Sequence, residues 1–301
     1  MMRFPALYPD EHVYSAFIRA RCLSGQMHLS TRRFFELNNL KYHWLRSQVP
    51  LCANLGSVMK MMRLDNEQLF RVRLMHTPFA PWLMSAEEGI LPKELTHAGT
   101  RSNVEENPLN VDKRWKFCVT CTQEEKRKLG VSFWHSNHQL PGARICSTHQ
   151  TPLHSLDELR YLDFTLPHHW LDKAQPLALI GDWQSAWQPF IYSVSDKIKI
   201  DIDWPRRVKR EVIKYLNLEM GVKRSDKPKF DALFETMTQE LGQDCLAGLF
   251  TAFAPHRQRR PNLLWMTLSG YSQAKGLRHP LYWLVIIFWL RHELSECRKL
   301  L

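Results

Sequence analysis

The sequence lacks any apolar run long enough to cross a membrane. Its most apolar stretch, Pro280 to Leu290 (PLYWLVIIFWL), has eleven residues, whereas a membrane-spanning helix needs about 20. The opening residues, MMRFPALYPD, contain no apolar segment of the kind found in signal peptides. We therefore expect a cytoplasmic protein with no membrane partner, in which residues 280–290 form a buried helix.

Motifs of several enzyme classes are also absent. The chain has no G-x4-G-K-[ST] phosphate loop, so we expect it not to hydrolyse ATP itself. It has no G-x-S-x-G nucleophile motif and no pair of carboxylates in a shared apolar setting. The sequence therefore favours a binding protein over an enzyme.

Negative charge is scarce relative to positive charge. The 41 Lys and Arg residues exceed the 30 Asp and Glu residues, which gives a net charge of +11. Such a surplus favours polyanionic partners, of which double-stranded DNA comes first. The alternative is that the charge only keeps the protein in solution. With 301 residues, 44% of them hydrophobic, the chain has room for two folded domains.

Cysteine is infrequent, but three of the seven cysteines belong to one motif. Cys118 and Cys121 are spaced C-x2-C, and Cys146 and His149 are spaced C-x2-H after 24 intervening residues. Each spacing lets one tight turn point two ligands at the same ion, and two such turns complete a tetrahedral zinc site. With four protein ligands the site has no position for a reactive water. We predict one structural Zn2+.

A rival prediction comes from a different functional class. His135 and His138 flank Asn137 beside the C-x2-C pair, which suggests a zinc-dependent HNH-like nuclease. Such a nuclease needs a general base and a metal ligand on separate elements. The two histidines are only three residues apart and no matching pair follows them. We expect instead that Trp134 packs against the zinc segment while Pro141-Gly142 turns the chain toward Cys146.

The N-terminal residues predict a helix, a short turn and a second helix. Asp10 is positioned to cap a helix that runs to about Ser24, and Gly25 ends it. Ser30 is positioned to cap the second helix, residues 31–37. This outline is typical of a DNA-binding helix-turn-helix, although an ordinary helical hairpin has the same pattern.

The remaining pattern is largely helical. Residues 54–74 continue the helical pattern, residues 91–110 are polar like a linker, and a proline-rich stretch extends to about Asp203. Residues 198–202 alternate like a short strand. We predict further helices over 205–218, 230–250 and 277–299. The fold class is mostly α: a helical N-terminal domain with a helix-turn-helix (1–110), a small zinc ribbon (111–160) and a helical C-terminal domain (161–301).

Clustered arginines are the candidates for nucleic-acid contact. One cluster lies in the second predicted helix, one begins the helix at 205, and one lies between Pro255 and Pro261, where the prolines restrict the backbone. Each cluster has the alternative of being an ordinary solvated surface. The candidate residues are Arg32, Arg33, Arg206, Arg207, Arg257, Arg259 and Arg260.

Three segments together resemble the TniQ/TnsD family of transposition proteins. The opening segment from Phe4 to Gly25 resembles the start of that family. The zinc segment, with F-C-x2-C, then F-W-x3-H-Q-L-P-G, then I-C-x2-H, is similar to its zinc-ribbon pattern. Residues 253–260, followed by His279-Pro280-Leu281, resemble its C-terminal part.

The resemblance implies a bacterial, non-enzymatic adaptor that selects the insertion site of a transposon. Such a protein binds target DNA at an attachment site and recruits the AAA+ ATPase TnsC. The alternative within the family is a CRISPR-associated adaptor that bridges an RNA-guided effector complex to TnsC. A homodimer is a further open expectation. The candidate residues for contact with the ATPase are Tyr8, Glu11, Tyr14 and Arg19.

Overall fold

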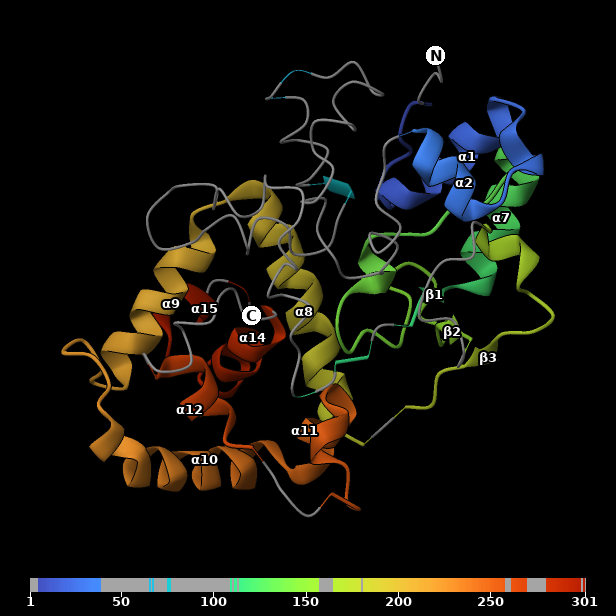
Figure 1. The fold of residues 1–301 in the computed structure, drawn as a ribbon. Helices are drawn as coiled ribbons and strands as arrows, with labels where there is room; N and C mark the ends of the chain where they lie inside the picture. Colours follow the sequence, from blue (N-terminus) through green and yellow to red (C-terminus); the bar gives the residue numbers. More distant parts are fainter. Residues whose placement is uncertain are drawn as a thin grey trace. The chain divides into compact units, whose positions relative to one another are not determined.

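The computed structural model describes residues 5–38, 65, 67, 75–76, 109, 111–112, 114–156, 165–179, 181–257, 261–269, 280–298 and 300. These residues belong to two compact units (Figure 1). The first contains the described residues up to 179, except Leu109, Val111 and Asp112, which belong with residues 181–300 in the second. The predicted mostly helical fold is confirmed, with a small three-stranded sheet beside a Cys3His cluster and a helical C-terminal region.

The first unit begins with α1 (Val13–Leu23), the 3-10 turn η1 (Gln26–His28) and α2 (Thr31–Leu37). Gly25 ends α1 with a φ of +70°, a conformation that glycine adopts without strain. The predicted cap of the second helix is confirmed, because Ser30 Oγ accepts a hydrogen bond from the Arg33 amide at 3.2 Å.

The cap predicted for the first helix is wrong. α1 begins at Val13 and its cap is His12, whose Nδ1 accepts a hydrogen bond from the Tyr14 amide at 3.2 Å. Asp10 has a φ of +58° and its carboxylate bonds to the zinc segment instead. The predicted apolar face of α1 is fully buried at the positions Val13, Ala16, Phe17 and Ala20.

The described residues between 116 and 176 contribute the sheet and one helix to the first unit. Strands β1 (Lys116–Phe117), β2 (His154–Ser155) and β3 (Gln175–Pro176) pair antiparallel in that order. Helix α7 (Val119–Leu129) follows β1 directly, and two 3-10 turns, η4 (Asn137–Gln139) and η5 (Pro167–His169), complete the unit.

Residues 10–15 pair with the same zinc segment. The His12 amide donates to the Trp134 carbonyl at 2.7 Å, and the Ser136 amide donates to the Asp10 carbonyl at 2.8 Å. The N-terminal helices and the zinc segment therefore share one compact unit. The domain boundaries at 110 and 160 stay predictions.

The second unit is helical in its described part. Its elements are α8 (Trp183–Ile200), α9 (Trp204–Tyr215), η6 (Arg224–Asp226), α10 (Lys227–Leu241), α11 (Gln243–Leu249), η7 (Thr251–Phe253), α12 (Leu263–Leu268), α14 (Pro280–Trp289) and α15 (Ser295–Arg298). The predicted apolar core helix is confirmed as α14, which is buried on all sides from Pro280 to Phe288 and contacts α9, α10 and α12. None of the helices in the described residues is both long and apolar enough to span a bilayer.

The proline-rich stretch contains α8, an 18-residue helix that accommodates Pro189 within it. Three predictions for the second unit are wrong. The single helix predicted over 277–299 is divided, because α14 ends at Trp289 and α15 begins at Ser295. The predicted strand at 198–202 does not form, because Val194 and Ile198, one helical turn apart, are both buried on α8. The single helix predicted over 230–250 is broken at Gly242, whose φ of +79° and ψ of 146° separate α10 from α11.

Some predictions fall outside the described residues. These are most of the helical segment 54–74, nearly all of the linker 91–110, and Arg259 and Arg260.

Candidate metal centre

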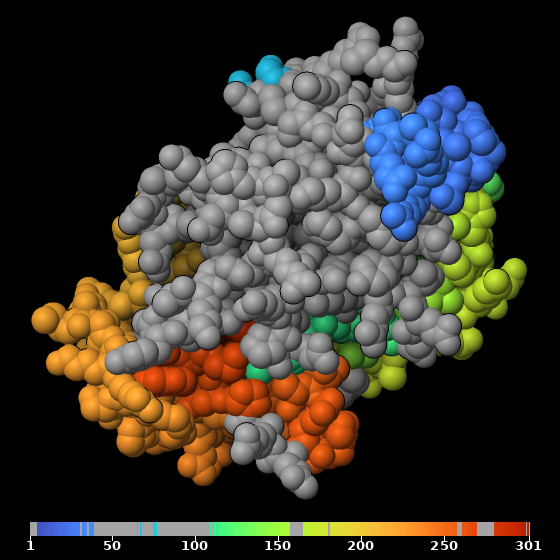
Figure 2. Space-filling view, in the orientation of Figure 1, coloured from blue at the N-terminus to red at the C-terminus, as the bar shows by residue number. Residues whose placement is uncertain are grey.

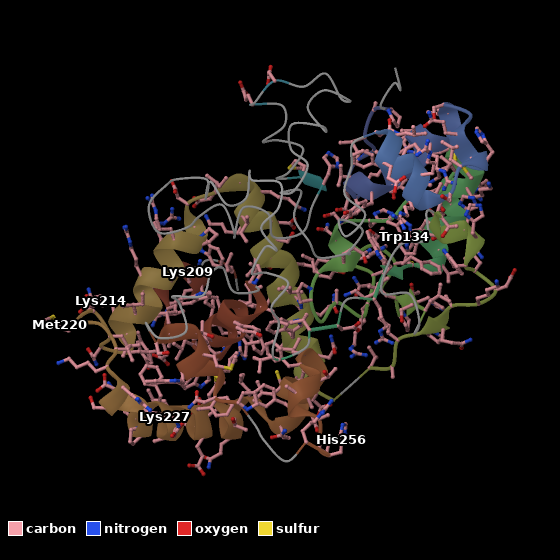
Figure 3. All side chains as sticks on the ribbon, viewed as in Figure 1. Trp134, Lys209, Lys214, Met220, Lys227 and His256 are labelled. Carbon is pink, nitrogen blue, oxygen red and sulfur yellow. The ribbon has the colours of Figure 1, made fainter. Side chains whose placement is uncertain are left out.

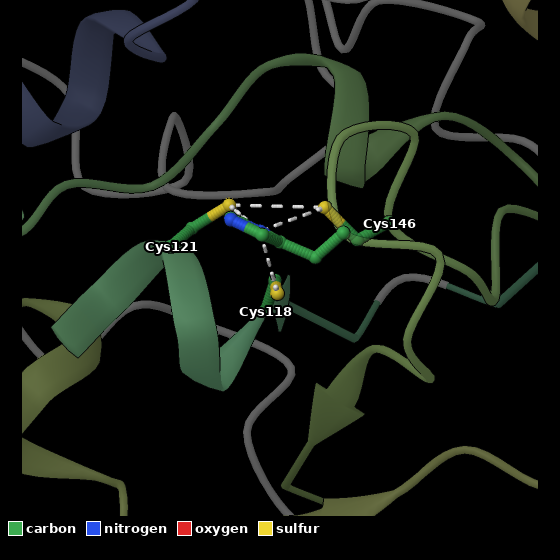
Figure 4. Close-up of side chains that lie close together, drawn as sticks. Cys118, Cys121 and Cys146 are labelled. Atoms are coloured by element: carbon green, nitrogen blue, oxygen red, sulfur yellow. Dashed lines mark hydrogen bonds between the residues drawn. The ribbon is translucent and has the colours of Figure 1, made fainter. Parts of the chain in front are cut away.

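The first two candidate ligands lie where β1 passes into α7. Cys118 is the N-cap of α7, and its carbonyl accepts a hydrogen bond from the Thr122 amide at 3.0 Å. Cys121 lies in the first turn of the helix. Because the residue spacing is one helical turn, both thiols are directed to the same side of the helix start (Figure 4).

The other two candidate ligands lie on a tight turn. Ile145 and Pro152 form an antiparallel bridge at the base of this turn, and the Cys146 amide donates to the Thr151 carbonyl at 2.9 Å. The Gln150 amide donates back to the Cys146 carbonyl at 3.0 Å, with Gln150 at a φ of +53°. The turn therefore brings Cys146 close to Cys121 at the start of α7 (Figure 4), and it brings His149 within reach of the same thiols.

The donor atoms of these four residues have the separations of a tetrahedral site. The Sγ atoms of Cys118, Cys121 and Cys146 and a ring nitrogen of His149 all lie within 4.8 Å of one another. Cys121 Sγ lies 3.7 Å from Cys146 Sγ, and His149 Nδ1 lies 3.6, 3.2 and 3.8 Å from the sulfur atoms of Cys118, Cys121 and Cys146. A tetrahedral zinc ion gives edges of about 3.8 Å between sulfurs and about 3.6 Å between sulfur and nitrogen. The four residues therefore fit one zinc ion.

The local electrostatics also suit a cation. Hydrogen bonding from the thiols of Cys121 and Cys146 holds the pKa of Cys118 well below its usual value. A bound divalent cation would replace the shared protons and favour three thiolates. Glu124 Oε1 lies 3.4 Å from His149 Nε2. This carboxylate orients the ring so that Nδ1 faces the thiols, as carboxylates commonly do beside metal-bound imidazoles.

The four protein ligands leave no coordination position open for water or substrate, and this decides which role a bound metal has. The three cysteines are buried and His149 is partly buried, so the four protein ligands fill a tetrahedral shell. A metal held in this way supplies folding free energy, since the ligands converge only in the folded chain. The geometry therefore supports a structural metal.

Aromatic side chains form a buried group in the same unit as the cluster. Trp134 is 1% exposed and packs against Trp115 and Phe117 at centroid distances of 5.2 and 5.8 Å (Figure 3). Gly142 turns the chain with a φ of +71°. Both features agree with the packing and the turn predicted from the sequence.

A buried group of charges that sequence reasoning missed lies beside these aromatic residues. His135 Nδ1 lies 3.1 Å from Asp10 Oδ2, and His135 Nε2 lies 2.5 Å from Glu125 Oε1. Burial lowers the pKa of His135, but the two carboxylates outweigh it and raise that pKa to about 9. His135 is therefore charged at neutral pH, and it links the N-terminal segment to α7. No local signal identifies this group, because Asp10 lies 125 residues before His135.

The two histidines of the nuclease hypothesis are not arranged for hydrolysis. Both ring nitrogens of His135 are occupied by carboxylates. His138 is 3% exposed, and burial lowers its pKa well below the usual value. Neither ring is presented to solvent as a general base or as an open metal ligand.

Three of the four residues predicted to contact the ATPase, Tyr8, Glu11 and Arg19, form an internal network. Glu11 is fully buried, and Arg19 donates to both of its carboxylate oxygens at 2.9 and 2.6 Å. The Arg19 guanidinium lies over the Tyr8 ring, which stacks on Phe133. Tyr14 is 2% exposed. The network holds the N-terminal segment in place, and its contact with a partner stays a prediction.

The predicted nucleic-acid residues differ in how many of their charges are already paired within the protein. Arg32 and Arg33 on α2 are exposed and pair with Glu36 at 2.9 and 3.6 Å. Arg207 is held between two carboxylates, at 2.6 Å from Asp201 and 3.1 Å from Glu296.

Two further arginines complete the described part of this set. Arg206 pairs with Asp203 at 3.0 Å, and Arg257 is exposed on the loop after η7. The described residues of the set belong to both units, two to the first and three to the second, and their contact with DNA stays a prediction.

Comparison with known proteins gives one result. The family model described as TniQ matches residues 2–153. This range, half of the chain, includes α1, α2 and the four ligands of the metal centre. No curated protein matches the chain.

Proposed function

The chain belongs to the TniQ family, which is implicated in transposition, and we propose that it is a target-site selection adaptor. In this role it binds target DNA and recruits the AAA+ ATPase TnsC, which directs insertion of the transposon. The chain itself performs no chemical step in the proposal. The metal, held by Cys118, Cys121, Cys146 and His149, stabilises the fold.

One observation carries the proposal: the part of the chain that matches the family contains a helix pair and a closed Cys3His centre in one compact unit. A centre with four protein ligands is typical of a structural metal that stabilises a binding module, whereas a catalytic metal keeps one position open. The second unit adds helices that lie outside the match, and one of its segments, residues 206–229, is strongly basic, as described below. Together these features suit a protein that connects DNA to other proteins.

Recruitment of the ATPase is the experiment that tests the proposal. A duplex that carries the insertion target is immobilised and incubated with ATP-bound TnsC from the same transposon, with and without this chain. We expect the chain to increase the amount of ATPase retained on the duplex. The chain with Glu11→Gln and Arg19→Gln tests the predicted ATPase contact, because these changes neutralise both partners of its buried ion pair. Equal retention of TnsC with and without the wild-type chain would contradict the proposal.

The source of target specificity is decided by a second measurement. The wild-type chain is incubated with sheared genomic DNA at physiological salt, and the bound pool is sequenced. Enrichment of one locus supports direct recognition of an attachment site. Uniform retention supports the CRISPR-associated alternative, in which a guide RNA supplies the sequence and this chain contacts DNA without base preference.

A further inference from the structure

Surplus positive charge is concentrated in one short segment of the second unit. Between Arg206 and Lys229 the chain has nine Lys or Arg residues and three Asp or Glu residues. This segment of 24 residues therefore accounts for six of the eleven net positive charges. It includes α9, the turn that follows, and the start of α10, all at the surface of the second unit (amber in Figure 2).

The packing of α9 forces its basic face outward. Trp204, Val208 and Val212 are fully buried and define the inner face of the helix. Arg210 and Lys214 follow Arg206 at intervals of four residues, so these three side chains lie in one row on the opposite face. Each step along the row is about 6 Å. The row continues past the helix, where the buried Leu216 and Leu218 fix the following turn.

The turn after α9 extends the basic surface. Asn217 and Gly221 adopt positive φ values of 54° and 81° and reverse the chain, which brings Lys223 and Arg224 to the start of α10. Met220 at the tip of this turn is 96% exposed, and Figure 3 places it beside Lys214 at the outer edge of the unit. The turn is thus ordered by its leucines while its charged residues remain in solvent.

The cations of this surface differ from the predicted arginines Arg206 and Arg207, which form ion pairs with nearby carboxylates. Among the described residues, none forms an ion pair with the exposed side chains of Arg210, Lys214, Lys223, Arg224 and Lys229. By contrast, Arg207 is occupied by Asp201 and Glu296. A cluster of unpaired cations repels itself in the free protein, and a polyanion removes that repulsion.

We infer that Arg210, Lys214, Lys223, Arg224 and Lys229 form a surface that binds the phosphate backbone of double-stranded DNA. The inference rests on the proposed function and gives it a location in the second unit, outside the family match at residues 2–153. Long lysine and arginine side chains on an exposed row suit phosphate contacts, which position a protein on DNA without recognising sequence. Proteins that bind single-stranded DNA use several aromatic side chains on which the bases stack. Helix α9 offers only one half-exposed aromatic residue, Tyr215, so its surface favours the duplex.

Salt dependence of binding tests the inference. The variant Arg210→Gln, Lys214→Gln, Arg224→Gln is compared with Lys126→Gln, Arg127→Gln, Lys173→Gln, which removes the same charge from exposed positions of the first unit. Affinity for a duplex of random sequence is measured between 50 and 200 mM salt. Each lost phosphate contact lowers the slope of log affinity against log salt by about 0.9. We expect the first variant to lose roughly 2 to 3 from the slope and the second to keep the wild-type slope.

Three outcomes would overturn the inference. The first is an unchanged slope in the α9–α10 variant, and the second is an equal loss in both variants, which would make the effect one of net charge. The third is equal binding of the wild-type chain to a polyglutamate peptide of matching charge, which would assign the surface to an acidic protein. An unchanged slope with intact binding leaves the proposed function standing. Absence of any duplex binding by the wild-type chain at 50 mM salt would contradict the function as well.

Discussion

Replacement of His135 by glutamine tests the buried charge group, and its effect on stability depends on pH. The folded pKa of His135 is about 9, whereas a histidine in an unfolded chain has a pKa of about 6.5. A raised folded pKa contributes stability that is complete below the unfolded value and disappears as pH rises through the folded value. The His135 side chain is 17% exposed, so solvent screens the interaction only weakly.

The two pKa values give the size of the effect. The protonated ring contributes about 3 kcal/mol to the free energy of unfolding at pH 6, about 2 kcal/mol at pH 7.5, and less than about 0.5 kcal/mol at pH 9.5. Glutamine carries no charge at any of these values. The difference between wild type and His135→Gln should therefore shrink by roughly 3 kcal/mol from pH 6 to pH 9.5.

Urea unfolding of the metal-loaded protein at the three pH values measures this difference. Other titrating groups are shared by both proteins and cancel. The control is His28→Gln, an exposed histidine of the same unit, which should change the free energy of unfolding by less than about 0.5 kcal/mol throughout. A His135→Gln deficit that stays constant from pH 6 to pH 9.5 would refute the charged state of His135.

Three other predictions concern the metal centre and the packing of α11. Cys146→Ala leaves three ligands, so we expect the variant to lose the one zinc ion per chain, which atomic emission measures. We also expect rapid proteolysis within residues 114–156. A variant that is metal-free but resists protease would show that the metal is not structural. Glu124→Gln removes the carboxylate 3.4 Å from His149 and should weaken zinc affinity about 10- to 100-fold in a chelator competition, which an unchanged affinity would contradict. Gly248→Ala places a Cβ 2.5 Å from the Trp183 ring and should cost about 1–3 kcal/mol in urea unfolding, whereas wild-type stability would mean that the ring moves freely.

The parts of the fold that were predictable depend on local spacing. The C-x2-C and C-x2-H pairs identify four residues whose donor atoms converge in the structure, because each pair needs only one turn of chain. The second N-terminal helix was predictable for the same reason, since Ser30 caps it through a bond three residues away. The apolar run at 280–290 predicted the buried helix from hydrophobicity alone.

The errors arose where distant contacts outweigh local preference. Asp10 has the sequence context of a helix cap, but its carboxylate bonds to His135 and to the Asn137 amide. The alternation at 198–202 suggested a short strand, yet Ile198 belongs to α8, which is stabilised by the packing of Trp187 and Phe190 on Phe288 of α14. No sequence window contains both partners of either contact. The same holds for Arg207, which the sequence offers as a DNA contact and the fold pairs with Glu296, 89 residues away.

Mapping of insertion sites tests the central claim, that this chain directs a transposon to its target. Transposition is run with the complete machinery in the presence of the wild-type chain, and the new insertions are sequenced across the genome. The account predicts that insertions concentrate at defined loci with the wild-type chain and that this concentration disappears when the chain is omitted. An identical distribution of insertions with and without the chain would contradict it.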